Sequence, residues 1–486
     1  MQGIYNRAFI LVLITSILSY NLSAQSQSLY SYQDLSGFSF AKQKDSLKKA
    51  WDCPQLYKDK ATQKKYKEIW DDRTDFLTNA IDANDFVNDG DIYNYISDIV
   101  SGLTKANPAL LKTKPLLLID RSASVNAYAM GGNVIIVNLG MITFVQSREE
   151  LTLAIAHELS HNILTHAENS MKERAVWLTS DEYKNSLKAV LDSKYERLTR
   201  LKKVMELYTF NRSRHSRYHE SDADSLAIIL LKKSNISFDP NFFLRLDSTD
   251  NEYMQPLKNP TKNYFASYKV PLEDGWFIKR TRGLSSHNYN FNNTTGIADS
   301  LKTHPDCVER FNKTKSEASI NGKLTPIPAD IKEKANKMLI WNIYDNLSLT
   351  ECLYRIFLEK DKGNIDPWYD FMAYNVLAGL YYSNKRLNRF NAIGIKPKEF
   401  ISKNYYELQN LLEQIPSDKL EQLVKAGSDR DFWSKMAVDA KGMKALFATL
   451  NFDNDNNPKA QAAAAKDFMT SNPSSMYCEF AEHFKK

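Results

Sequence analysis

The segment that most constrains the fold runs from Ser147 to His166 and reads SREELTLAIAHELSHNILTH. Ser147 followed three residues later by Glu150 is a capping-box signature, which predicts that a helix begins here. Apolar residues project on several sides of this helix, and a helix that is apolar nearly all round is a buried one. The segment therefore predicts a core helix that also contains two histidines and a glutamate.

Two histidines in this helix have the spacing of metal ligands. His157 and His161 are one turn apart on the same face, so their ring nitrogens can reach a single ion. Glu158 projects beside the pair and can accept a proton from a water molecule at that ion. Burying these three polar side chains is costly unless they have a compensating role. On this segment alone, a buried helix that happens to contain histidines remains the alternative.

A third ligand is expected on a second helix, from about residue 216 to 233. The metzincin pattern requires a glycine and a third histidine shortly after His161, and those positions hold leucine and alanine. Residues 220–224 read ESDAD, which places Glu220 and Asp224 on one helix face. We expect Glu220 to bind the metal and Asp224 to orient a histidine ring. Three protein ligands leave one position for water, as in catalytic zinc sites.

The remaining pattern predicts a mainly α protein with a small β-sheet. Residues 114–120 and the β-branched run 134–137, which follows the Gly131-Gly132 turn, are expected to pair as two strands. Residues 168–215 are predicted to be a charged helical insertion and residues 234–300 mostly loops. After the proline-containing boundary at 324–330, helical spacing continues to the end. This helical part has one tetratricopeptide-like segment without a second copy, so an irregular bundle remains the alternative.

The N-terminus predicts export. Arg7 precedes an apolar run from Ala8 to Leu18, which is too short to span a membrane, and a cleavage site follows Ala24. Leu22 is unfavourable for cleavage, so a retained anchor is the alternative. We expect a periplasmic or secreted protein divided into a signal peptide (1–24), a metallopeptidase domain (25–325) and a helical domain (326–486).

The charge and the cysteine content limit which partners and which disulfides can be expected. The net charge of +6 is spread along the chain, which argues against nucleic-acid binding, and no transmembrane helix is expected in the mature chain. An exported chain permits disulfides, and four cysteines allow three pairings. Free buried thiols are the alternative. The four are Cys53, Cys307, Cys352 and Cys478.

In these motifs the sequence resembles the HtpX-like and CaaX-prenyl-protease group of zinc metallopeptidases, family M-48 of the gluzincins, and especially its soluble exported members. The resemblance covers about residues 90–311 and ends with THPDCVER. It implies a zincin-like fold, one Zn²⁺ per chain held by His157, His161 and Glu220, and Glu158 as catalytic base. It also implies endopeptidase activity in envelope protein quality control. The insertion between the two zinc motifs is longer than the family pattern.

Further expectations concern substrate, partners and regulation. In zincins an edge strand before the zinc helix pairs with extended substrate, so we expect peptide to dock on the strand Asn133–Asn138. Envelope protein partners are expected to bind the C-terminal helices. His304 is a candidate fourth ligand or oxyanion stabiliser, whereas His166 and His219 are not expected to be ligands. The alternative function is a chaperone or adaptor whose zinc site is latched and weakly active.

Overall fold

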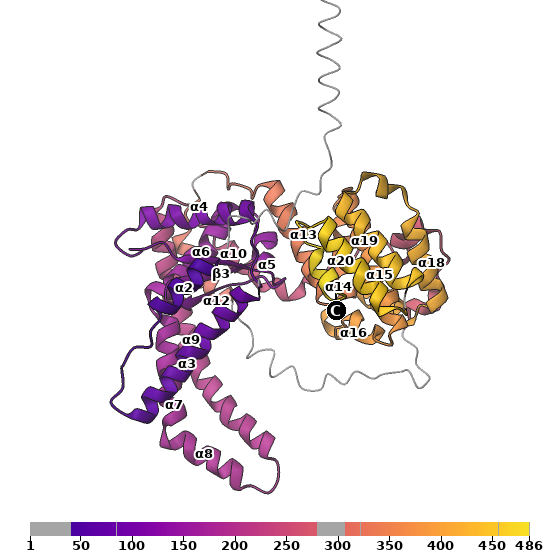
Figure 1. Ribbon diagram of the computed structural model, residues 1–486. Helices are drawn as coiled ribbons and strands as arrows, with labels where there is room; N and C mark the ends of the chain where they lie inside the picture. The colour runs from indigo at the N-terminus through magenta and orange to yellow at the C-terminus, as the bar shows by residue number, and fades with distance from the viewer. Residues whose placement is uncertain (1–39, 84, 279–306, 321, 455, 486) are drawn as a thin grey trace, which may run out of the picture.

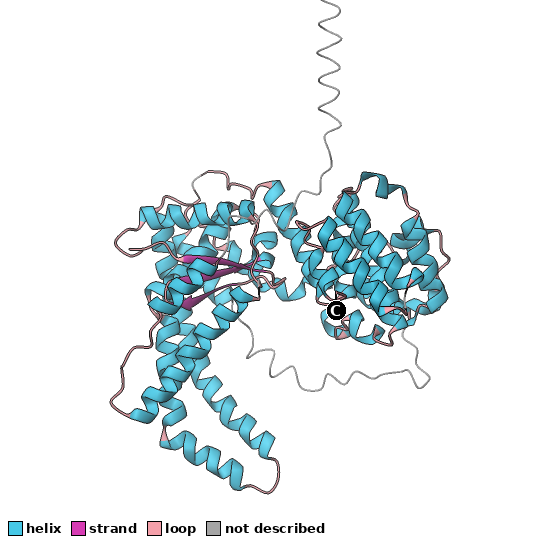
Figure 2. Ribbon diagram, in the orientation of Figure 1, coloured by secondary structure: helices cyan, strands magenta, loops and turns pink. Residues whose placement is uncertain are grey.

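The computed structural model describes residues 40–83, 85–278, 307–320, 322–454 and 456–485. It is mainly helical with one small sheet, which confirms the predicted fold class (Figure 2). The predicted signal peptide and His304 lie outside the described residues. Among the described helices, none combines the length and the apolar character needed to cross a membrane.

The sheet has three strands in the order β1-β3-β2. The strand β1 (Leu116–Asp120) pairs in parallel with β3 (Val134–Asn138), and β2 (Ala127–Gly131) pairs antiparallel with β3. The prediction missed β2 because its alanines give a weak strand signal. All five residues of β3 are buried, and its apolar side chains alternate between two hydrophobic clusters, as expected for a strand covered on both faces.

This sheet order corrects the predicted docking strand. The strand Asn133–Asn138 includes β3, whose backbone already pairs with β1 and β2, so a peptide cannot add to it. One of the two edge strands is β2, which is joined to β3 by a tight turn in which Gly131 and Gly132 have positive φ angles of 76° and 55°. A side chain at Gly132 would also collide with the indole of Trp51, 2.2 Å from its Nε1.

Two packed helices form the centre of the N-terminal lobe. The helix α6 (Arg148–Ile163) begins where predicted, with the Ser147 hydroxyl accepting the backbone N–H of Glu150 at 3.2 Å. It packs along α9 (Arg197–Lys233). We predicted that this second helix starts near residue 216, which is wrong, because the charged residues before it continue the same helix. The helices α2 (Ala41–Ala50), α3 (Lys60–Asp82), α4 (Gly90–Ala106) and α5 (Leu139–Phe144) complete this lobe.

The predicted charged insertion is an arm that projects from the lobe (Figure 1). It consists of α7 (His166–Thr179), α8 (Asp181–Asp192) and the first half of α9. Near the body of the lobe, α7 packs against α3. The chain then forms α10 (Asn241–Asp247) and three short 3₁₀ helices (Thr249–Met254, Thr261–Tyr268 and Asp274–Phe277). Most of the described part of residues 234–300 is therefore irregular or only briefly helical.

The C-terminal lobe is entirely helical among its described residues. Its main helices are α13 (Ala329–Asp345), α14 (Leu349–Asp361), α15 (Pro367–Lys385), α16 (Arg389–Ile393), α17 (Lys403–Gln414), α18 (Ser417–Ser428), α19 (Val438–Ala448), α20 (Pro458–Ser471) and α21 (Cys478–Glu482). Its first helix, α13, packs on α5 of the other lobe. A tetratricopeptide arrangement stays a prediction.

A segment before the predicted boundary packs against this C-terminal lobe. Asn410 on α17 donates a hydrogen bond from Nδ2 to the carbonyl of Phe277 at 3.2 Å. Tyr264 stacks on Phe357 of α14 with ring centroids 4.5 Å apart. The boundary at 325/326 stays a prediction, but it does not separate all the contacts of the two lobes. All four cysteines lie among the described residues, and none of them forms a disulfide there.

Candidate metal centre

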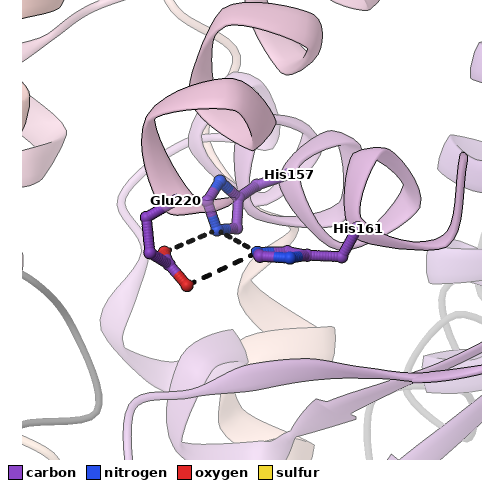
Figure 3. Close-up of side chains that lie close together, drawn as sticks. All are labelled: His157, His161 and Glu220. Carbon is purple, nitrogen blue, oxygen red and sulfur yellow. Dashed lines mark hydrogen bonds and ion pairs between the residues drawn. The ribbon is translucent and has the colours of Figure 1, made fainter. Parts of the chain in front are cut away.

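Three side chains from α6 and α9 point toward one another (Figure 3). His157 Nε2 and His161 Nε2 are 3.0 Å apart. The carboxylate of Glu220 lies 3.2 Å from His157 Nε2 through Oε2 and 3.6 Å from His161 Nε2 through Oε1. The packing of α9 on α6 therefore brings together the three residues predicted as ligands.

This donor set fits a zinc ion. Two atoms that bind one tetrahedral zinc at about 2.0–2.1 Å lie about 3.3 Å apart, which is the range of the three separations found here. Two imidazoles and one carboxylate are also a ligand set of catalytic zinc sites. Burial and the charge of His157 lower the pKa of His161 to about 3, so its ring is neutral, the form that binds metal.

Asp224 lies behind His157, one helical turn after Glu220. The His157 Nδ1–H donates to Asp224 Oδ1 at 2.9 Å, as predicted for a carboxylate that orients a ligand ring. Burial lowers the pKa of His157, but the charge of Asp224 and the hydrogen bonds to Asp224 and Glu220 outweigh it and raise the pKa to about 10. Burial alone would raise the pKa of Asp224, whereas Arg310 and His157 hold it well below its usual range.

Arg310 is a residue of this site that sequence reasoning missed. It lies on α12 (Cys307–Thr314), is buried, and donates to both oxygens of Asp224, from Nη2 at 2.6 Å and from Nε at 2.8 Å. Its guanidinium also lies over the ring of Phe243, 4.4 Å from the centroid. This arginine is part of the motif THPDCVER. A charged side chain on the buried face of a helix needs a partner of opposite charge, and that was the signal that could have identified Arg310.

His161 also has a partner behind it. Its Nδ1 lies 2.8 Å from Nδ1 of His166, the first residue of α7. The ring of His166 stacks in parallel on His219, with centroids 4.2 Å apart and an interplanar angle of 13°. His166 and His219 were not expected to be ligands, and neither belongs to the converging group of three.

Glu158 lies beside the ligand group and is 8% exposed. Burial raises its pKa to about 7, with the charge of Glu220 adding to the effect and that of His157 opposing it. The carboxylate accepts a hydrogen bond from the backbone N–H of Ala129 on β2. Glu158 is therefore held between the ligand group and the edge of the sheet.

The ligand group lies in a cleft of about 650 Å³. One wall is the β2 edge, residues 126–130, and the others come from α3, the start of α7 and α9. In an antiparallel pair, alternate residues turn their backbone groups toward and away from the partner strand. Asn126 faces β3, since its carbonyl accepts the N–H of Asn138 at 3.0 Å, so the peptide groups of Ala127 and Ala129 face away from it.

A partly buried His-His-Glu group on two packed helices, beside a small sheet and a glutamate, is the arrangement of a metallopeptidase. Residues 93–318 match the sequence model of Peptidase family M48. A beta-barrel assembly-enhancing protease of Vibrio cholerae is 26% identical over 178 residues, which are 36% of this chain and 36% of that protein. The chain thus spans about a third of the relative that it matches. The region that contains the ligand group is therefore similar to peptidase family M48, a family of zinc metalloproteases.

Proposed function

We propose that the protein is a zinc-dependent endopeptidase whose ion is held by His157, His161 and Glu220. The observation that carries this proposal is the convergence of these three ligand atoms beside Glu158 in a cleft along a free strand edge. Lewis acidity is what a zinc ion would supply there, polarising a carbonyl group and lowering the pKa of a water molecule.

In this proposal Glu158 moves the proton. Its carboxylate takes the proton of the attacking water and later delivers it to the leaving amine. Burial favours the protonated state of Glu158, which the second of these roles requires. The hydrogen bond from Ala129 fixes the carboxylate, and Asp224 fixes the ring of His157.

The substrate is proposed to bind as an added strand along β2. The peptide group of Ala127 and the carbonyl of Ala129 face the cleft and can pair with an extended peptide, whereas the Ala129 N–H already donates to Glu158. This geometry would place the peptide beside Glu158, which itself contacts Ala129. The proposed docking strand is thus β2 in place of β3.

Export and a role in envelope protein quality control also belong to this proposal. Support comes from the signal-like N-terminal sequence and from the name of the Vibrio cholerae relative. The helices after residue 325 are proposed to bind envelope protein partners. The adaptor alternative depends on a latch by His304, which lies outside the described residues.

The test compares casein cleavage by the wild type with that by Glu158→Gln. The variant should keep its zinc and lose activity by about 10²–10⁴-fold, the usual contribution of an acid–base residue. The matched control is Glu173→Gln on α7, an exposed glutamate outside the ligand group, which should cleave like the wild type. Zinc binding without cleavage in the wild type would favour the adaptor, and undiminished cleavage by Glu158→Gln would refute this mechanism.

A further inference from the structure

The two histidine ligands differ in what holds the second nitrogen of each ring. His157 Nδ1 faces the carboxylate of Asp224 at 2.9 Å, whereas His161 Nδ1 faces another imidazole nitrogen, His166 Nδ1, at 2.8 Å. A carboxylate can only accept a hydrogen bond, but an imidazole nitrogen can donate or accept according to its tautomer. The tautomers of His161 and His166 are therefore coupled through this hydrogen bond.

Metal binding permits one arrangement of protons in the histidine pair. His161 Nε2 points at His157 and Glu220, so this nitrogen must offer its lone pair to the ion. A neutral imidazole has one N–H, which then lies on His161 Nδ1. At 2.8 Å this N–H donates to His166 Nδ1. His166 must accept with its Nδ1 lone pair and carry its own proton on Nε2.

The backbone and the packing around His166 hold its ring in the accepting position. Thr165 has a φ of 56°, a left-handed conformation that is uncommon for a β-branched residue. This residue lies in the turn between α6 and α7, and His166, the first residue of α7, contacts His161 near the end of α6. His166 is 8% exposed, and its ring is covered by the stacked ring of His219.

We propose that His166 is a positioning residue that accepts the Nδ1–H of His161 and thereby fixes the tautomer and orientation of this ligand. The inference rests on the proposed zinc site. It assigns His166 a role outside the ligand set, equivalent to that of Asp224 for His157. Partners of this kind typically contribute about 10–100-fold to metal affinity.

The test uses the full chain and two variants of nearly the same shape. In His166→Asn the amide oxygen takes the place of Nδ1 and can accept the hydrogen bond, whereas His166→Leu offers no acceptor. Zinc affinity is measured by competition with a chelator. His166→Leu should bind zinc about 10–100-fold more weakly than the wild type, and His166→Asn should recover most of that loss.

A spectrum and a control variant separate this role from a structural one. With Co²⁺ in place of zinc, the visible spectrum should change in His166→Leu and stay close to the wild type in His166→Asn. His219→Leu removes the stacked ring but leaves the acceptor, so it should weaken zinc binding less than His166→Leu does. If His166→Leu does not fold, His166→Gln replaces it, because its longer amide places the polar atoms beyond the Nδ1 position.

The outcomes are distinguishable. Equal losses of zinc affinity in His166→Asn and His166→Leu, or no loss in either, would overturn the role of His166 while leaving the zinc site intact. A wild-type chain that does not bind zinc would overturn the proposed function, and the positioning role with it. Weak binding by His166→Leu together with recovery in His166→Asn is the expected result.

Discussion

Arg310 and Asp224 form a buried two-pronged ion pair, with distances of 2.6 and 2.8 Å from the guanidinium nitrogens to the carboxylate oxygens. The same carboxylate accepts the Nδ1–H of His157 at 2.9 Å. The pair joins α12 to α9, across a separation of 86 residues in the sequence. It therefore links the position of a ligand ring to the packing of a distant helix.

Replacing Arg310 with methionine should destabilise the fold strongly. The substitution leaves Asp224 buried without its cation, and breaking a buried pair in this way costs about 3–5 kcal/mol. Denaturant unfolding in EDTA measures the loss. The double variant Arg310→Met/Asp224→Leu should be less destabilised than the sum of the single variants, because the two side chains act as a pair. Arg200→Met, at an exposed position on the arm, is the control and should change stability little. Additive single effects would contradict the coupling.

Zinc affinity should rise with pH. The pKa of His157 is raised to about 10 by its carboxylate neighbours, so below that pH its ring holds a proton that zinc must displace. Glu220 is ionised throughout, because its pKa is lowered to about 2 although burial opposes this. One displaced proton predicts a gain in affinity of about tenfold per pH unit between about pH 6 and 8. Calorimetry in buffers of different ionisation enthalpy counts the protons, and zinc binding without proton release would contradict this account.

A proline at Ala127 should weaken substrate binding without removing the metal. Proline deletes the backbone N–H that faces the cleft, and it is tolerated on edge strands. Losing one hydrogen bond costs about 1 kcal/mol, which corresponds to roughly a fivefold lower kcat/KM for an extended peptide. Ala127→Gly keeps the N–H and is the matched control. Equal kinetics in Ala127→Pro and Ala127→Gly would argue against docking on β2.

The parts of the site that could be predicted depend on local geometry. His157 and His161 are brought together by the pitch of a single helix, and so are Glu220 and Asp224, so residue spacing was sufficient to group each pair. The helix start at Ser147 was predictable for the same reason, since the cap and its partner are three residues apart.

The parts that could not be predicted depend on contacts between distant segments. The order of the sheet placed β2 at the edge and β3 at the centre, and that order follows from packing rather than from strand composition. Arg310 reaches Asp224 from another helix, 86 residues away in the sequence. His166 is only five residues from His161, but their contact depends on the left-handed conformation of Thr165 between the two helices, which helical spacing does not predict. The spacing of residues along the sequence does not predict contacts of this kind.

The most direct test of the central claim is the zinc content of the purified wild type beside that of Glu220→Ala, with Glu173→Ala as the matched control. The account predicts about one zinc ion per chain in the wild type and in the control, and a strong loss in Glu220→Ala, because an open catalytic site has few ligands to spare. Equal zinc content in all three proteins, or no zinc in the wild type, would contradict it.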